Sequence, residues 1–142
     1  RVLPLEKKGE LVHAHADFQI VISYNPGYQS LMKDLKQSTK QRFGALDFNY
    51  PSHDIESEII AHETGVSTEI AEKLVSIAER ARNLKGHGLD EGISTRMLIY
   101  AGSLIVKKVD AHAACRVDLV RPITDDPDMR DALDAAVSTF FN

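Results

Sequence analysis

The pattern of apolar and polar positions divides the chain into two regions with different periodicities. Residues 1 to about 51 contain short extended runs around one helix, whereas apolar residues after Pro51 recur at the three- and four-residue spacing of helices. We therefore expect an α/β segment over residues 1–51, followed by an all-α segment over residues 52–142.

Two extended runs open the first region. Residues 1–6 and 11–15 are predicted to form a hairpin, because the sequence Lys7-Lys8-Gly9-Glu10 between them is typical of a turn. The hairpin would present two lysines at its tip.

The rest of the first region contains two further predicted strands and one helix. Residues 18–23 (FQIVIS) are almost continuously apolar and β-branched, which is typical of a strand covered on both faces. A polar helix is predicted over about residues 30–41, and a short strand over 43–48 precedes Pro51.

Five helices are predicted in the second region. They begin at or just after Ser52, Ser67, Ser94, Asp110 and Asp126, with Pro127 at the first position of the last helix. The helix after Ser67 has the clearest amphipathic stripe, formed by Ile70, Leu74, Ile77, Ala78, Ala81 and Leu84. For the helix after Ser94 the predicted buried side is Met97, Ala101, Leu104 and Ile105, ending near Lys108; for the last helix it is Met129, Leu133, Ala136, Val137 and Phe140.

Composition narrows the class of protein. The chain has 142 residues with 17 basic and 21 acidic side chains, a net charge of −4, which argues against a dedicated nucleic-acid binder. Cys115 is the single cysteine, so there is no disulfide framework and a reducing, cytoplasmic location is expected. No apolar run approaches the ~18 residues of a membrane span. The chain begins with Arg1 rather than Met, which suggests a piece of a longer protein.

Several common site motifs are missing from the sequence. It contains no phosphate-binding loop, no dinucleotide-binding glycine motif, no zinc-protease motif and no nucleophile elbow. His13 and His15 would share one strand face, but no third ligand follows at a recognisable spacing, so we expect no metal site.

Three polar residues are candidates for chemistry, and each also has a simpler interpretation. Asn25 follows the apolar run 18–23, where a side chain can reach a ligand, but Asn-Pro-Gly is also an ordinary turn. Arg42 follows a predicted helix end, where the helix dipole alone favours a cation. Arg96 lies in the first turn of a helix, where a cation is mildly disfavoured unless an anion shares the site.

The three residues occur in an order that resembles the AAA+ ATPases of the MoxR group, and more closely the CbbQ/NirQ/NorQ family. The resemblance extends over nearly the whole chain, and long contiguous runs of similar sequence make it specific. These runs are residues 17–30 (DFQIVISYNPGYQS), 33–43 (KDLKQSTKQRF), 86–96 (GHGLDEGISTR) and 124–128 (TDDPD).

The resemblance implies a nucleotide-handling role for each candidate. Asn25 corresponds to the first sensor, which orients the water that attacks the γ-phosphate of ATP. Arg42 corresponds to the arginine finger, which reaches the nucleotide of the neighbouring subunit, and Arg96 to the second-sensor arginine of the lid. Lys7 and Lys8 would lie at the tip of the pre-sensor hairpin and are candidate contact residues, although a solvated basic turn is the favoured interpretation of them.

The resemblance also implies a fold and an activity. The chain would be the C-terminal part of an AAA+ P-loop core, consisting of hairpin, sensor strand, helix and short strand over residues 1–51, plus a helical lid domain over residues 52–142. The phosphate loop and the acidic Mg²⁺-binding strand are missing, so the chain alone is expected to be inactive, whereas the full-length parent would hydrolyse ATP with Mg²⁺. Without the strand that normally lies between them, strands 18–23 and 43–48 would lose their shared partner and present unpaired edges.

Partners follow from the same resemblance. The resemblance implies a hexameric ring of subunits, a von Willebrand factor A-type partner protein, and a target enzyme that the ring activates. Rubisco is the favoured target, and a nitric oxide or nitrite reductase is the other. A different class also fits the pattern: a non-catalytic helical interaction module that retains the lid architecture.

Overall fold

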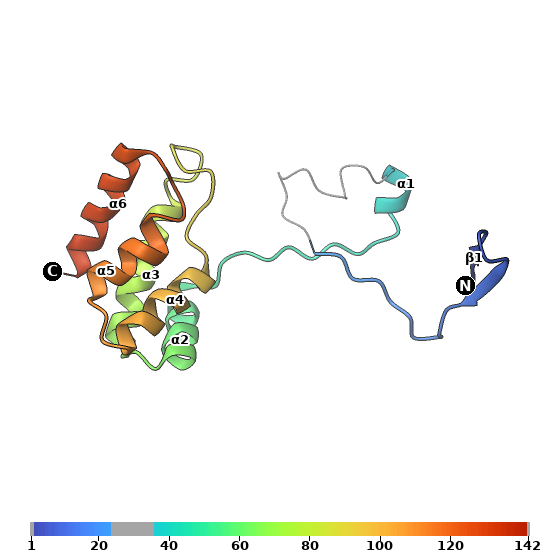
Figure 1. The fold of residues 1–142 in the computed structure, drawn as a ribbon, viewed down its shortest axis with the longest axis horizontal. Helices are drawn as coiled ribbons and strands as arrows, with labels where there is room; N and C mark the ends of the chain where they lie inside the picture. The colour runs from blue at the N-terminus through green and yellow to red at the C-terminus, as the bar shows by residue number, and fades with distance from the viewer. Residues whose placement is uncertain (1, 24–35, 142) are drawn as a thin grey trace. The chain divides into compact units, whose positions relative to one another are not determined.

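The structure is a computed structural model that describes residues 2–23 and 36–141. These residues belong to two compact units, residues 1–47 and residues 48–142, and each is considered by itself (Figure 1). Together they form a small β-structured start followed by a helical unit, as the apolar pattern predicts. The predicted division into domains at residue 51 stays a prediction.

The first unit begins with the predicted hairpin. Strand β1 (Val2–Leu5) pairs antiparallel with strand β2 (Glu10–His13), with Val2 opposite His13 and Leu5 opposite Glu10. The backbone N–H groups of Lys8 and Gly9 both donate to the Leu5 carbonyl at 2.9 Å and close the turn. The hairpin prediction is therefore confirmed.

The two other strand predictions are wrong for this chain. Residues 18–23 and 43–48 have no regular secondary structure. Apart from the half-buried Phe43, their apolar side chains are exposed, most strongly Val21 and Phe48. A strand needs a neighbour to satisfy its backbone N–H and C=O groups. Within the described residues the sheet contains β1 and β2 alone, so these apolar segments have no strand to pair with.

The helix predicted over residues 30–41 is described only in its last part. Helix α1 (Gln37–Lys40) is a single short turn. The beginning of that prediction, and Asn25 with it, lies outside the described residues.

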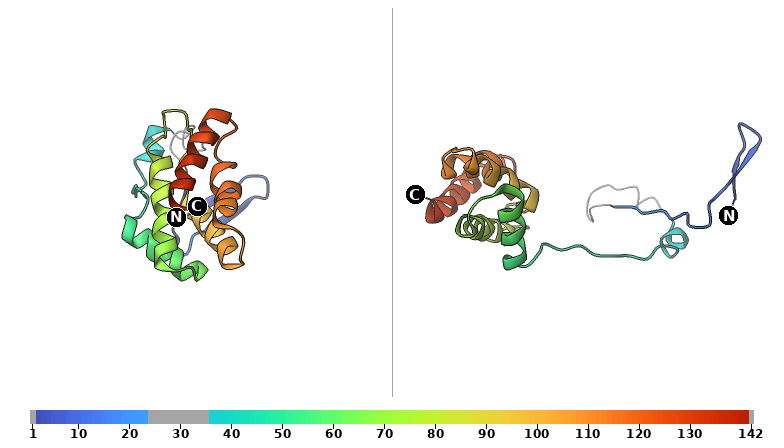
Figure 2. Two further views of the ribbon diagram at one scale, coloured as in Figure 1. Left: turned by 90° about the vertical axis from the view of Figure 1, so that its left-hand side faces the viewer. Right: turned by 90° about the horizontal axis from the view of Figure 1, so that it is seen from below.

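The second unit is a bundle of helices (Figure 2). Helix α3 packs against α2, α4 and α6, and α4 also contacts the short elements that precede α6. In the part of the chain that the structure describes, no helix is both long and apolar enough to cross a membrane. The elements are α2 (His53–Thr64), α3 (Thr68–Arg82), α4 (Thr95–Val106), α5 (Ala111–Cys115), the π-helical turn η1 (Arg116–Val120) and α6 (Pro127–Phe140).

Local capping chemistry determines most of the helix ends. The side chains of Ser67, Asp110 and Asp126 each accept a hydrogen bond from the backbone N–H three residues later, at 3.3, 2.9 and 3.0 Å. Ser52 occupies the predicted N-cap of α2 but makes no capping bond with its side chain. Helix α2 ends at Gly65, whose φ of 80° favours glycine.

One hydrophobic core holds the second unit together. On α3 the predicted stripe is confirmed, because Leu74, Ile77 and Ala78 are fully buried. On α4 the prediction is only partly right: Ala101 is buried as expected, but Leu98 is buried in place of the half-buried predicted positions around it. Helix α4 carries apolar residues on nearly every side, so its period alone does not identify the face that packs.

Helix α4 ends with a non-glycine residue in the left-handed conformation. Lys107 is the C-cap and Lys108 has a φ of 70°. The N–H of Lys108 donates to the Ile105 carbonyl at 2.9 Å, and that of Val109 donates to the Leu104 carbonyl at 3.1 Å. The helix end is thus closed by hydrogen bonds whose geometry a glycine satisfies with less backbone strain.

Replacing Lys108 by glycine is expected to stabilise the second unit by about 1 kcal/mol, because glycine adopts a positive φ without steric strain. Urea unfolding monitored by circular dichroism measures the change. Lys107→Gly is the matched control: Lys107 has a φ of −76°, so glycine there should destabilise the protein. Equal effects of the two substitutions would contradict the assignment of strain to Lys108.

Candidate functional site

The start of helix α4 carries the predicted second-sensor residue, Arg96. The Oγ of Ser94 accepts a hydrogen bond from the N–H of Met97 at 3.4 Å and caps the helix. Arg96 lies in the first turn, with its side chain exposed. Among the described residues it has no ion-pair or hydrogen-bond partner, so its guanidinium is available to an anion.

A hollow of about 400 Å³ adjoins this helix start. It lies between the beginning of α4 and the segment from η1 to residue 123. Its lining mixes acidic, small and apolar residues: Asp90, Glu91, Gly92, Ser94, Met97, Tyr100, Asp118, Pro122 and Ile123.

A buried ion pair connects α2, α3 and the start of α4. The guanidinium of Arg82 donates through Nη1 and Nη2 to the two carboxylate oxygens of Glu56, both at 2.7 Å. Its Nε donates to the carbonyl of Ile93 at 2.8 Å, and the Thr95 hydroxyl donates to Glu56 Oε1 at 2.6 Å. The side chain of Glu56 is completely buried, and only 11% of the Arg82 side chain is exposed.

Two further contacts enclose the Arg82 side chain. The aromatic ring of Tyr50 stacks on the guanidinium, 3.7 Å from the ring centroid. Gly92 also lies close to the Arg82 side chain. A Cβ at position 92 would be 2.8 Å from Arg82 Cγ and 3.3 Å from Arg82 Cα. A larger residue at position 92 would push the α4 start away from α3.

The ion pair sets the protonation state of Glu56. Burial by itself raises the pKa of this carboxyl, but hydrogen bonds from Arg82 and Thr95 and the charge of Arg82 outweigh burial. The net result is a pKa below the ordinary value of 4.5. Glu56 is therefore ionised at neutral pH in spite of its complete burial.

The other predicted site residues lie elsewhere in the chain. Arg42 is exposed in the turn that follows α1, where its backbone N–H donates to the Thr39 carbonyl at 3.0 Å. It belongs to the first unit, and Arg96 belongs to the second. Asn25 is outside the described residues.

The described residues contain no group of three or more histidine, cysteine or acidic side chains placed to hold a metal ion. His15 contacts its neighbour instead: its Nδ1 lies 3.6 Å from an Asp17 carboxylate oxygen and accepts the backbone N–H of Asp17 at 3.2 Å. Cys115 is buried, and burial together with nearby acidic groups raises the pKa of its thiol to about 12. The thiol is thus protonated and unreactive at neutral pH.

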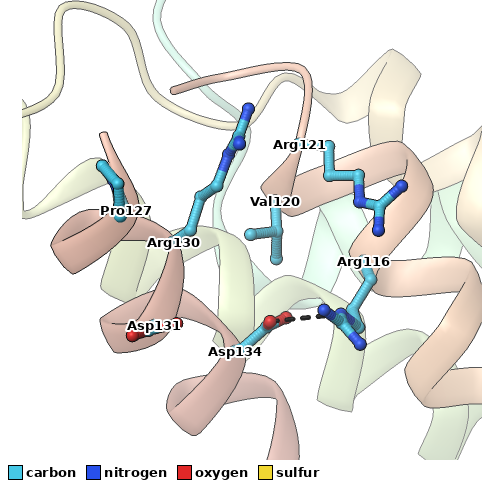
Figure 3. A pocket seen from close by; sticks show the side chains of 7 residues that line it. All are labelled: Arg116, Val120, Arg121, Pro127, Arg130, Asp131 and Asp134. Atoms are coloured by element: carbon cyan, nitrogen blue, oxygen red, sulfur yellow. Dashed lines mark ion pairs between the residues drawn. The ribbon is translucent and has the colours of Figure 1, made fainter. Parts of the chain in front are cut away.

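A second concavity, of about 390 Å³, lies between η1 and α6 and is lined by three arginines (Figure 3). Arg116 pairs with Asp134 at 3.1 Å, and Arg130 pairs with Asp125 at 2.6 Å. Figure 3 shows Arg116 and Arg121 projecting from one side and Arg130 from the other. The π-helical turn joins the first two, since the N–H of Arg121 donates to the carbonyl of Arg116 at 3.0 Å.

Asp118 belongs to the same π-helical turn and lines the hollow beside α4. Burial raises the pKa of its carboxyl. Its Oδ2 is buried and has no hydrogen-bond partner among the described residues. The hollow therefore contains a carboxyl that is easier to protonate than an ordinary aspartate.

The sequence contained few signals for the ion pair. Glu56, Arg82 and Thr95 are separated by 26 and 13 residues, and no motif joins them. The one available signal is that each charge lies one helical turn from an apolar residue of the core, Ile60 for Glu56 and Ala78 for Arg82, and an unpaired charge is rare in such a place.

Comparison with known proteins agrees with the resemblance in the sequence. Residues 56–140 match the family described as CbbQ/NirQ/NorQ C-terminal. The chain is 67% identical over 99% of its length to Protein CbbQ of Hydrogenophilus thermoluteolus, of which it covers 53%. It is 47% identical to Denitrification regulatory protein NirQ of Pseudomonas aeruginosa, over 89% of this chain and 49% of that protein. It is 41% identical to Protein NorQ of Paracoccus denitrificans, over 99% and 52%.

The helical unit, with Arg96 at the start of α4, is therefore a C-terminal domain of the CbbQ/NirQ/NorQ kind. The chain belongs to the CbbQ/NirQ/NorQ family. It spans about half the length of the curated relatives that it matches.

Protonation of Glu56 is expected to destabilise the second unit in acid. Because the folded pKa is lower than the unfolded one, the ion pair contributes stability above about pH 4.5, and this contribution is lost as the pH falls through the folded pKa. Glu56→Gln should cost about 3 kcal/mol at pH 7 and progressively less in acid. Urea unfolding from pH 7 down to pH 3 measures the difference.

Glu69→Gln is the control for this experiment. Lys73 also lowers the pKa of Glu69, but that pair is on the surface, so its loss should have little effect on stability. Asp118 affects the pH dependence of stability in the opposite direction. Because its pKa is raised in the folded protein, it makes the folded state relatively more stable at low pH than at high pH. A Glu56→Gln difference that stays constant over the whole pH range would contradict the ionised state of Glu56.

Proposed function

We propose that this chain is the C-terminal part of a ring-forming AAA+ ATPase that uses ATP binding and hydrolysis to activate a partner enzyme. The observation that carries the proposal is its similarity to the CbbQ/NirQ/NorQ family along almost the entire chain. Two relatives are denitrification regulatory proteins by name, which agrees with an activating role.

The lid function rests on the start of α4. Arg96 is a cation in the first helical turn, where the helix dipole opposes it, and it has no partner among the described residues. A γ-phosphate at this helix start would remove that conflict, because phosphate oxygens match both the guanidinium and the free backbone N–H groups. Arg96 would then report the presence of the γ-phosphate within its own subunit.

Two residues of the first unit complete the proposed site. Arg42, exposed after α1, would serve as the arginine finger of a neighbouring subunit. Asn25 would orient the attacking water as the first sensor. Phosphoryl transfer depends on positioning and charge stabilisation, to which a finger contributes about 10³–10⁵ in rate.

ATP and Mg²⁺ are the proposed cofactors of the full-length protein. Bound together, they supply the phosphoanhydride and neutralise part of its charge. The group that suits an anionic nucleotide is the exposed guanidinium of Arg96, which does not line the hollow beside it, since that hollow carries Asp90, Glu91 and Asp118. No metal-ligand cluster forms among the described residues. The Mg²⁺ ligands would come from the part of the protein that precedes this chain.

The proposed partners are further copies of the protein in a hexameric ring, a von Willebrand factor A-type protein, and the target enzyme. Rubisco is the favoured target because Protein CbbQ is more similar to this chain than the NirQ and NorQ relatives are. A nitric oxide or nitrite reductase is the alternative. Reconstitution of each purified target with the full-length protein and ATP would distinguish them.

In the full-length protein, Arg42→Ala is expected to lower ATP turnover by at least about 10³-fold with little change in ATP affinity, because the finger acts across the subunit boundary. Steady-state hydrolysis and equilibrium nucleotide binding measure the two quantities. Lys36→Ala, an exposed position on the same unit, is the control. Unchanged turnover in Arg42→Ala would rule out the finger assignment.

Arg96→Ala is expected to weaken ATP binding by about tenfold and ADP binding much less, because the guanidinium would contact the γ-phosphate. Isothermal titration of both nucleotides to the full-length protein measures the ratio. Arg80→Ala is the control, since Arg80 stacks on Phe140 away from the hollow. Equal affinities before and after substitution would favour the non-catalytic interaction module.

A further inference from the structure

Each of the four residues before Arg96 makes a specific contact that fixes the start of α4. Gly92 packs directly on the Arg82 side chain, and Ile93 accepts the Arg82 Nε–H through its carbonyl. Ser94 caps α4, and Thr95 donates its hydroxyl to the buried Glu56 carboxylate at 2.6 Å. The next residue, Arg96, is exposed.

Arg82 and Arg96, which precede and follow this loop, differ in burial and in hydrogen bonding. Arg82 has all of its donor nitrogens engaged, by Glu56 and by the Ile93 carbonyl, and is nearly buried. Arg96 has no partner among the described residues. A long side chain that has to reach one phosphate loses less entropy if its backbone is already fixed.

Stability alone does not account for a buried ion pair in this place. Desolvation of two charges offsets much of their attraction, and apolar residues of similar volume often stabilise a fold equally well. Apolar residues would not fix the orientation of the neighbouring groups. The guanidinium of Arg82 does so, because its donors have fixed directions and bind a carboxylate through one edge and a backbone carbonyl through Nε. The pair therefore fixes the orientation of the α4 start as well as its position.

We propose that Glu56, Arg82 and Thr95 are positioning residues that hold the α4 start so that Arg96 is aimed at the γ-phosphate. The inference rests on the proposed nucleotide-sensing role of Arg96. The Thr95 hydroxyl is the most direct link, because it joins the residue next to Arg96 to the buried carboxylate. Loss of that hydroxyl leaves the Glu56–Arg82 pair and the Arg82–Ile93 hydrogen bond in place but removes the bond from Thr95 to the carboxylate.

The test compares Thr95→Val with Thr95→Ser in the full-length protein, with ATP and ADP as the probes. Valine keeps the shape of threonine and removes the hydroxyl, whereas serine keeps the hydroxyl. Thr95→Val should reduce the preference for ATP over ADP by about tenfold, and Thr95→Ser should leave it near the wild-type value. Isothermal titration measures both affinities.

A purely structural role of Thr95 is tested with Val137→Ala, which removes buried volume from α6. This variant should lower the Tm as much as Thr95→Val or more without changing the ATP-to-ADP preference. If Val137→Ala changes that preference equally, or Thr95→Val leaves it unchanged, the positioning role is wrong.

Arg96→Ala, measured in parallel, separates the two proposals. If Arg96→Ala reduces the preference for ATP and Thr95→Val does not, only the positioning role fails. If Arg96→Ala has no effect, the sensing role itself fails and the positioning role fails with it.

Discussion

The helical unit depends on one buried guanidinium. Arg82 lies at the end of α3, and its donors reach a carboxylate on α2 and a backbone carbonyl just before α4. If Glu56 or Arg82 were replaced by a neutral residue, the remaining buried charge would be left uncompensated, at a cost of several kcal/mol. The geometry of three helices is thereby linked to one planar group with fixed donor directions, and the surrounding apolar core supplies the bulk of the burial.

Sequence alone predicted the helices well because their ends depend on local chemistry. Ser67, Asp110 and Asp126 cap helices through bonds to a backbone N–H three residues away, so a short stretch of sequence contains the whole interaction. The stripe on α3 was equally clear, since its polar face is distinct. Helix α4 was harder, because nearly all of its faces are apolar and only its neighbours select Leu98 for the core.

The failures of prediction involve residues that are distant in sequence. The apolar run 18–23 reads as a buried strand, but a strand is completed by a partner, and periodicity says nothing about whether that partner is present. The Glu56–Arg82 pair was missed for a related reason: each residue alone resembles an ordinary charged position on an amphipathic helix. Arg96 was identified because its charge conflicts with its own helix, which is a local property.

The contacts around Arg82 differ in strength, so the weaker ones are expected to break before the stronger ones when the unit unfolds. Tyr50 precedes α2, at the point where the chain enters the helical unit, and its exposed stacking contact is worth about 1 kcal/mol. The pair with Glu56 is buried and bidentate, and breaking it costs about 3–5 kcal/mol. A force applied to the entering segment would therefore detach the aromatic ring first and leave the start of α4 in register. The Tyr50 contact is therefore the weaker of the two attachments to Arg82, and its loss would leave the Glu56–Arg82 pair intact.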